Sequence, residues 1–327
     1  MEAKKILIIR FSSIGDIVLT SPVIRCLKKQ LPNAQIHYLT KENYKNILSS
    51  NPYITKIHTL KHSIADTAKE LKSENFDFVV DLHHNLRSLL VKTKLNIPSQ
   101  TFNKLNVRKW IYVKTKRKSI MPSIHIVDRY FEAVSKLGVT NDMAGLDFFD
   151  GQISNIDLPF DNYVAIVCGA THTTKQIPPK YIEYLCQNIK QNIILLGDSN
   201  DAKRLQTIAI SNLPNVVNMC GKCSLSQSAL YVKHSSLVIT SDTGLMHIAA
   251  AYNKNIITIW GNTTPQLGMY PYMPTGKGKY INIEAKDVKC RPCSKIGYKE
   301  CPKKHFLCMN KIVWDDVVHA VERIISQ

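Results

Sequence analysis

The turn formed by residues 10–16, Arg-Phe-Ser-Ser-Ile-Gly-Asp, carries side chains suited to chemistry. It follows an apolar run and precedes a helical pattern. In open α/β sheets, ligands bind at the carboxyl ends of the strands, where such turns stand. Asp16 lies at the predicted helix start, where the helix dipole favours an ionised carboxylate. An ionised carboxylate in a ligand site could act as a general base, although Asp16 could equally serve only as a helix cap.

A second turn, residues 168–175, reads Cys-Gly-Ala-Thr-His-Thr-Thr-Lys and again follows a strand-like run. Backbone amides and hydroxyls can surround phosphate oxygens, and the Lys175 ammonium can supply a positive charge. The turn is not a P-loop, because it lacks the Gly-Lys-Ser/Thr ending. It therefore predicts either a phosphate site or a solvated Thr-rich loop.

The third turn joins an apolar run to the segment Ser-Asp-Thr-Gly-Leu-Met-His at residues 241–247. Asp242, the amides of Thr243 and Gly244, and His247 would meet at one helix N-terminus, which is an anion-binding end. A histidine on an apolar helix can also be an ordinary core residue. The preceding Asp-Thr-Gly favours a functional site here.

The elements that must position these turns alternate between strands and helices. In the first half, strands are expected at residues 5–11, 35–40, 56–59 and 76–81, with helices at 18–30, 44–49 and 63–73. The second half restarts the pattern, with strands at 163–168, 192–196, 216–219, 237–240 and 256–260. A closing amphipathic helix is expected at 312–326. Such alternation predicts parallel, doubly wound sheets in two Rossmann-like domains, with a junction near the proline of residues 158–161.

The charge balance points to an acidic partner. The 327 residues contain 43 Lys and Arg against 25 Asp and Glu, a formal net charge of +18. Ten of the basic residues and no acidic residue lie between Asp81 and Asp128, and seven of the ten lie within 104–118. This stretch could be a solvated surface, a nucleic-acid site or a surface for an anionic lipid, but it carries no recognised nucleic-acid motif. Without a signal-peptide pattern or an apolar run of ~18 residues, we expect a soluble cytoplasmic protein.

Nine cysteines are present, and most are scattered in apolar segments, which favours a reducing compartment. Four of them lie close together near the C-terminus. They could form a structural zinc site, although the second pair lacks the usual short spacing. Reduced thiols in a compact loop are the alternative. The four are Cys290, Cys293, Cys301 and Cys308.

Taken in order, these segments resemble the lipopolysaccharide heptosyltransferase family, glycosyltransferase family 9. The resemblance rests on residues 8–22, 169–175, 196–198, 220–225 and 241–251. Residues 260–265, Trp-Gly-Asn-Thr-Thr-Pro, are similar to the family's Phe-Gly-Pro-Thr-x-Pro segment, with Asn262 in place of proline. The chain also departs from the family at Cys168 and at Gln176-Ile177. The resemblance implies an α/β GT-B fold, in which two facing Rossmann-like domains with parallel sheets enclose a cleft.

The resemblance also implies roles for individual residues. Asp16 matches the catalytic base, Thr171 and Lys175 match diphosphate contacts, Asp201 the ribose contact and Cys223 the adenine pocket. The segment from Asp242 to His247 matches the part that grips the sugar and phosphates. Donor-binding residues are accordingly expected at Ser13, Gly15, Thr171, Lys175, Asp201, Cys223, Asp242, Thr243, Gly244 and His247.

The implied reaction transfers a heptose or related sugar from an ADP-sugar to the lipopolysaccharide inner core, with inversion. No cofactor is expected to be required, and because the chain has no Asp-x-Asp motif, no metal is expected in catalysis. The acceptor would be a phosphorylated lipid A–core on the anionic inner-membrane surface, contacted by Arg87, Arg108 and Lys109. Alternatives are another nucleotide-sugar enzyme, such as an epimerase, or a nucleic-acid-binding protein.

The expected boundaries are an acceptor-binding domain at residues 1–157, a nucleotide-sugar-binding domain at 158–311 and a closing helix at 312–327. The basic stretch would then belong to the acceptor-binding domain. The protein is expected to act from the cytoplasmic face of the inner membrane as a peripheral enzyme.

Overall fold

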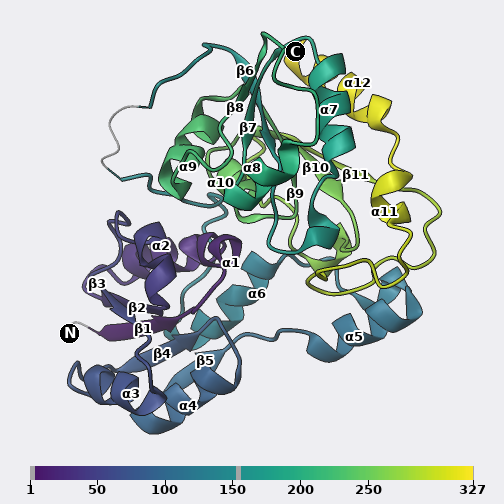
Figure 1. Cartoon of the computed structure of the whole chain (residues 1–327). Helices are drawn as coiled ribbons and strands as arrows, with labels where there is room; N and C mark the ends of the chain where they lie inside the picture. The colour runs from purple at the N-terminus through teal and green to yellow at the C-terminus, as the bar shows by residue number, and fades with distance from the viewer. Residues whose placement is uncertain (1–3, 152–155, 327) are drawn as a thin grey trace. The chain divides into compact units, whose positions relative to one another are not determined.

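A computed structural model describes residues 4–151 and 156–326 of the chain (Figure 1). It divides into two compact units. Residues 1–104 and 124–151 form the N-terminal unit, and residues 105–123 and 152–327 form the C-terminal unit. No helix in the described part of the chain is long and apolar enough to cross a bilayer.

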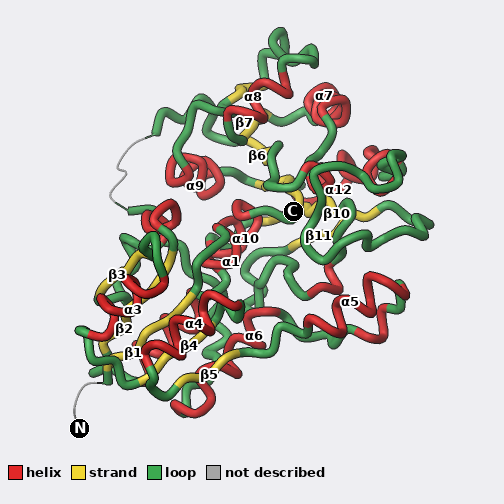
Figure 2. The backbone as a smooth tube through the Cα atoms, turned by 60° about the horizontal axis from the view of Figure 1, so that its bottom comes forward, coloured by secondary structure: helices red, strands yellow, loops and turns green. Residues whose placement is uncertain are grey.

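The N-terminal unit is built on a parallel sheet of five strands in the order β3-β2-β1-β4-β5 (Figure 2). Its central strand β1 is apolar on both faces, and residues 6–9 have no exposed surface, as expected of a strand covered by helices on both sides. The strands are β1 (Lys5–Ile9), β2 (Gln35–Thr40), β3 (Lys56–Thr59), β4 (Phe78–Asp81) and β5 (Ser99–Thr101). The helices are α1 (Ile14–Val18), α2 (Ser21–Gln30), α3 (Ile64–Lys72), α4 (Leu86–Leu95) and α6 (Ile126–Tyr130), with 3-10 turns η1 (Glu42–Ile47) and η3 (Phe131–Leu137).

The C-terminal unit has a parallel sheet of six strands in the order β11-β10-β9-β6-β7-β8. These are β6 (Tyr163–Val167), β7 (Asn192–Leu196), β8 (Val216–Asn218), β9 (Leu237–Ser241), β10 (Asn255–Trp260) and β11 (Tyr280–Glu284). Its helices are α5 (Asn106–Thr115), α7 (Pro179–Asn188), α8 (Ser199–Leu205), α9 (Leu225–His234), α10 (Gly244–Ala251), α11 (Leu307–Asn310) and α12 (Trp314–Ile325), with 3-10 turns η2 (Lys118–Ile120), η4 (Thr173–Lys175) and η5 (Pro265–Leu267).

Both sheets confirm the predicted α/β class with two Rossmann-like units. In each sheet, the first strand of the unit lies in the interior of the sheet. Successive strands are first added on one side of it and then, after one reversal, on its other side. The reversal falls between β1 and β4 in one unit and between β6 and β9 in the other. Ligands of open α/β sheets bind at such a switch point, beyond the carboxyl ends of the strands.

Local details differ from the sequence expectations. The helix expected at 18–30 is α2, which begins at Ser21 with Pro22 in its first turn, and a separate short helix, α1, forms in the segment 14–18 that was expected to be a turn. Proline fits a first turn because its missing amide hydrogen has no intrahelical partner there. The helix expected at 44–49 is the 3-10 turn η1. The closing helix is α12, within the expected range.

The basic helix α5 packs in the C-terminal unit, whereas the sequence placed it in a first domain of residues 1–157. Tyr112 is 1% exposed, and its hydroxyl lies 3.0 Å from Thr264 Oγ1. Met121 and Leu267 pack against the Tyr112 ring. Lys116 Nζ donates to Pro292 O at 2.6 Å. These contacts link residues far apart in the sequence, so composition and spacing gave no sign of them.

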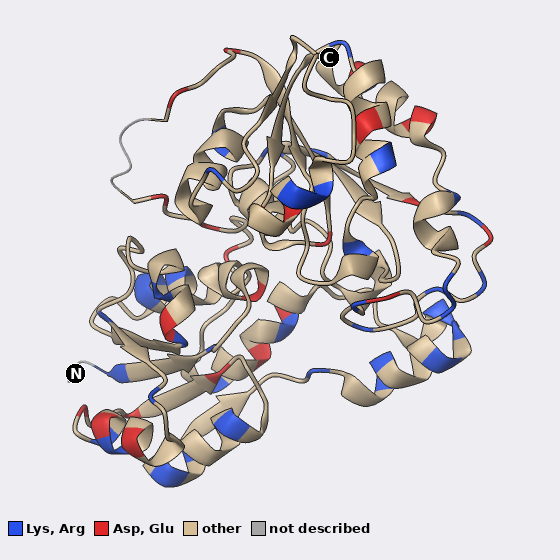
Figure 3. Ribbon diagram, in the orientation of Figure 1, with Lys and Arg blue, Asp and Glu red and all other residues tan. Residues whose placement is uncertain are grey.

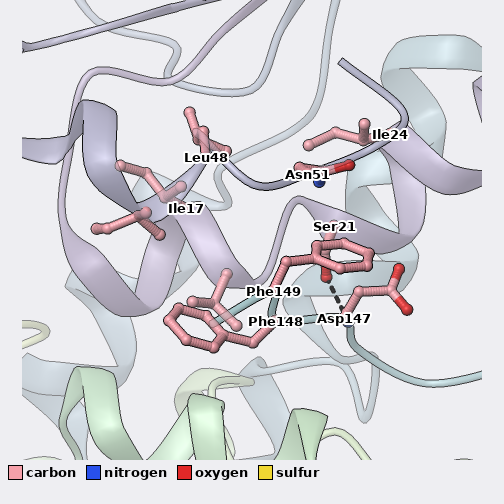
Figure 4. A pocket seen from close by; sticks show the side chains of 10 residues that line it. Ile17, Ser21, Ile24, Leu48, Asn51, Asp147, Phe148 and Phe149 are labelled. Atoms are coloured by element: carbon pink, nitrogen blue, oxygen red, sulfur yellow. Dashed lines mark hydrogen bonds between the residues drawn. The ribbon is translucent and has the colours of Figure 1, made fainter. Parts of the chain in front are cut away.

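The segment of residues 141–150 is fastened to α2 by Arg25, which is 3% exposed. Its guanidinium donates to both carboxylate oxygens of Asp142, at 2.9 and 2.8 Å, and also to Asp147. The Asp147 amide donates to Ser21 Oγ at 2.8 Å (Figure 4). The cavity beside this contact has a volume of about 10 Å³, which is room for one water molecule and too little for a sugar substrate.

We expect Arg25→Met to lower the free energy of unfolding by about 3–5 kcal/mol, because two carboxylates would lose their buried partner. The measurement is a urea unfolding curve by circular dichroism. Lys29→Met, on the exposed side of the same helix, is the control and should change stability by less than ~0.5 kcal/mol. Equal stabilities for the two variants would contradict the importance of the Arg25 cluster.

Candidate active site

In the N-terminal unit, Asp16 stands in the first turn of α1, beyond the carboxyl end of β1. Its Oδ2 accepts from Ser13 N at 3.1 Å and from Ser13 Oγ at 2.8 Å, which closes a capping box. Its Oδ1 lies 2.5 Å from Arg10 Nη2. The side chain remains 22% exposed, so the carboxylate is held by Arg10 and Ser13 and is still partly accessible to solvent.

Arg10 joins the two turns at the switch point of this sheet. Its Nε donates to Ser12 O at 2.9 Å and its Nη1 to Leu82 O at 2.6 Å. Burial opposes its charge, but the Asp16 carboxylate outweighs that and raises the pKa of Arg10 above its usual value. Arg10 is therefore a permanent cation paired with the Asp16 carboxylate.

His83 is a residue of this site that the sequence reasoning missed. It follows β4, and its ring lies 4.7 Å from that of Phe11. Burial, with Arg10 nearby, lowers the pKa of His83 to about 4, so the imidazole is neutral at pH 7. Its Nδ1 is buried and has no hydrogen-bond partner among the described residues. The strand-end sequence Asp81-Leu-His-His was the available signal.

In the C-terminal unit, the turns after β6 and β9 meet at the switch point. Lys175 Nζ lies 2.6 Å from Asp242 Oδ2. The hydroxyl of Thr263, which follows β10, donates to the same oxygen at 3.1 Å. Both charged side chains keep some exposure, 15% and 12%. The ammonium can therefore contact an incoming anion without leaving Asp242.

Helix α10 begins next to this ion pair. Thr243 is its N-cap, and its hydroxyl accepts from Met246 N at 3.4 Å. Gly244 is the first helical residue, and His247 follows one turn later with 2% exposure. The other amides of the first turn have no intrahelical acceptor and can donate to oxyanions.

Two further polar side chains lie buried at the same sheet edge. Ser241 ends β9 and is 1% exposed, while Asn262 follows β10 and is 2% exposed. The Ser241 hydroxyl and both amide atoms of Asn262 have no hydrogen-bond partner among the described residues. Buried polar atoms are rarely left unpaired, because an unpaired one raises the free energy of the folded state. A polar ligand that forms hydrogen bonds with these atoms would remove that penalty. Asn262 was noted in the sequence only as a departure from the family.

Asp201 is buried, and its carboxylate is already hydrogen-bonded within the protein. It is 4% exposed and accepts from Asp198 N at 3.0 Å and from Arg204 Nη2 at 3.1 Å. A Cβ on Gly169 would come 1.9 Å from Asp201 Oδ2, so any larger residue there would displace the Asp201 carboxylate. Asp201 therefore completes the capping box of α8, whose N-cap is Asp198, and fills the space against Gly169. The ribose contact expected of it stays a prediction.

The remaining predicted residues are dispersed. Thr171 is exposed on the turn after β6, and Cys223 is half-buried before α9, where burial raises its pKa. Ser13 is exposed and Gly15 is buried, both at α1. Arg87 is exposed on α4, while Arg108 is exposed and Lys109 half-buried on α5. In the described part of the chain, the four C-terminal cysteines do not form a group with metal-ligating distances, so the zinc alternative for them finds no support.

Comparisons with known proteins agree with this geometry. The model of glycosyltransferase family 9 (heptosyltransferase) matches residues 64–303. The chain belongs to glycosyltransferase family 9. It is therefore a glycosyltransferase, as the sequence predicted.

Relatives extend over the whole chain. Lipopolysaccharide heptosyltransferase 1 of Campylobacter coli is 25% identical and aligns over 98% of both proteins. Lipopolysaccharide heptosyltransferase 3 of Escherichia coli K12 is 25% identical over 96% of both. A family 9 glycosyltransferase from Veillonella parvula superposes with a TM-score of 0.75 at 21% identity, covering 99% of this chain and 98% of that one. Escherichia coli WaaC with ADP-2-deoxy-2-fluoro heptose gives a TM-score of 0.70 at 18% identity, covering 98% and 99%.

Proposed function

We propose that this family 9 enzyme transfers a heptose from ADP-heptose to the inner core of lipopolysaccharide. The observation that carries the proposal is the pair of switch-point sites, one with an open carboxylate and one with a cation beside a helix N-terminus. Full-length similarity to lipopolysaccharide heptosyltransferases, and a fold shared with a heptosyltransferase solved with an ADP-heptose analogue, support the choice of substrates.

Asp16 acts as the general base in this proposal. It takes the proton of an acceptor hydroxyl as that oxygen bonds to the anomeric carbon of the sugar, while the bond from that carbon to the diphosphate breaks. Attack from the face opposite the leaving group inverts the anomeric centre. Arg10 and Ser13 hold the carboxylate in one orientation, and positioning of this kind lowers the barrier.

Asp16→Asn should lower kcat by at least ~10²-fold, because the amide cannot accept the proton. The control is Asp66→Asn, a capping carboxylate on α3, which should leave kcat unchanged. Turnover with ADP-heptose and a lipid A–core acceptor is the readout, and ADP affinity should be nearly the same in all three proteins. Retention of most of the turnover by Asp16→Asn would remove Asp16 from the mechanism.

The leaving diphosphate is stabilised by Lys175 and by the amides at the start of α10. Negative charge grows on this group as the glycosidic bond breaks, and fixed donors that face it stabilise the transition state. We infer that these groups take the place of a divalent metal in catalysis, so turnover should persist in EDTA. Thr171, Cys223 and Asp201 are proposed to contact the rest of the nucleotide, and His247 the diphosphate.

Lys175→Ala and His247→Ala should each weaken ADP binding by about 1–3 kcal/mol, the usual worth of a charge-assisted hydrogen bond. Isothermal titration calorimetry with ADP measures this directly. The control is Lys180→Ala. Lys180 is an exposed residue on α7, and removal of its positive charge should leave the ADP affinity unchanged. Unchanged ADP affinity in either site variant would exclude that residue from the donor site.

The basic helices α4, of the N-terminal unit, and α5, of the C-terminal unit, are each proposed to contact the acceptor or the anionic membrane. Neither helix contains an acidic residue (Figure 3). Helix α4 exposes Leu86, Leu89 and Leu90, at 70%, 53% and 41%, beside Arg87. Helix α5 exposes Trp110 at 60% beside Arg108. Apolar and basic side chains together suit an anionic lipid surface, which supports peripheral action at the cytoplasmic face of the inner membrane.

Replacing Arg87 and Arg108 together with Ser should raise the apparent KM for the lipid acceptor about 30-fold, because each of the two lost basic contacts near an anionic surface is worth ~1 kcal/mol. The dependence of KM on salt should flatten, since fewer charges are screened. Lys69→Ser with Lys72→Ser on α3 is the charge-matched control. The same acceptor KM in both double variants would refute the lipid-facing role.

A further inference from the structure

Two buried histidines and a glutamate meet in the N-terminal unit, outside the site described above. His37 on β2 and His58 on β3 are 3% and 2% exposed. Glu74 lies in the connection between α3 and β4. One nitrogen from each histidine and one oxygen of Glu74 lie within 4.8 Å of one another.

We propose that His37, His58 and Glu74 form a binding site for Zn²⁺. Two imidazole nitrogens and a carboxylate oxygen are a ligand set that zinc takes up in proteins, with water in the fourth position. In the described part of the chain, no other group of three such side chains comes this close.

The distances are close to those of a tetrahedral site. His37 Nδ1 lies 2.9 Å from His58 Nε2, and His37 Nδ1 lies 3.9 Å from Glu74 Oε2. Tetrahedral ligands at zinc bond lengths of 2.0–2.2 Å stand roughly 3.3 Å apart. The two nitrogens must separate by a few tenths of an ångström and the carboxylate must approach by somewhat more.

The outer contacts also suit a metal. His58 Nδ1 faces Glu70 Oε1 at 3.6 Å. A metal-bound histidine usually directs its second nitrogen, as N–H, at a carboxylate, which orients the ring and strengthens it as a ligand. Phe76 stands edge-on to both imidazoles, with ring centroids 5.0 and 6.0 Å away. Burial lowers the pKa of His37 to about 4 and that of His58 below its usual value, so both rings are in the neutral form that binds metal.

Two lysines compete with the metal for Glu74. Lys56 Nζ lies 2.5 Å from Oε1 and Lys5 Nζ lies 3.5 Å from Oε2. Lys56 is 55% exposed and can turn into solvent. A bound cation would displace it, so the site should bind zinc more tightly once Lys56 is replaced by a neutral residue. If the two histidines only form a hydrogen bond with each other, replacement of Lys56 should not change zinc binding.

The site is distinct from the proposed catalytic groups of its unit. His37 and His58 lie within their strands and Glu74 precedes β4, whereas Asp16 follows the carboxyl end of β1. Zinc here would join β2, β3 and the α3–β4 connection. It would act on stability and leave the sugar-transfer step unchanged.

The test measures zinc bound to the reduced full-length protein by equilibrium dialysis and elemental analysis. His37→Gln and His58→Gln should each lose one equivalent relative to the wild type. His62→Gln, an exposed histidine of the same unit, should lose none. Lys56→Gln should tighten binding at this equivalent by about five- to tenfold, and because Lys56 is on the surface this variant remains informative if the histidine variants fold poorly.

Cobalt separates this site from the cysteines. Co²⁺ added to the wild type should give visible bands without a thiolate charge-transfer band for the equivalent that His37→Gln removes. Equal zinc stoichiometry in all variants, or no tightening in Lys56→Gln, would overturn the proposal. Sugar transfer in EDTA should persist whether or not the zinc site exists, so failure of this proposal and failure of the proposed function are distinguishable.

Discussion

The constraint on which the rest of the structure depends is the burial of the central strands β1 and β6. Both strands are apolar on both faces, so neither can carry a polar group of the site within its length. Polar side chains can stand only in the turns that follow. The reversal of strand order beside each of these two strands then keeps helices from covering those turns. Asp16 and Lys175 are where they are for this reason.

The two switch points have opposite electrostatic designs. At Asp16, the pairing cation is the buried Arg10, and the carboxylate is the group left accessible. At Lys175, cation and carboxylate are both partly exposed, and the adjoining helix start adds the partial positive charge of its free amides. In the proposed function, the first site takes a proton and the second holds an anion. A transferase that must deprotonate an acceptor and release a diphosphate needs both.

Some of the basic residues stabilise the fold, whereas others are exposed on the surface. Lys92 pairs with the buried Asp81 at 2.9 Å, and Lys116 is engaged by backbone carbonyls. Both therefore contribute to the fold and are poorly placed to contact a partner. Arg87 and Arg108 are exposed beside apolar side chains. A count of basic residues could not make this distinction, because it depends on which groups lie within reach after folding.

The sequence by itself determined the α/β class, the strands that surround the switch points, the three polar turns at the strand ends and the family. These follow from local signals: apolar runs, turn residues and short motifs in order. Only the tertiary structure decided that α5 packs with Thr264, that Asp201 fills the space against Gly169, that His83 stands beside Arg10, and that His37, His58 and Glu74 meet. Each of these depends on contacts between distant residues, which the pairing of strands and the packing of helices create and which no local pattern records.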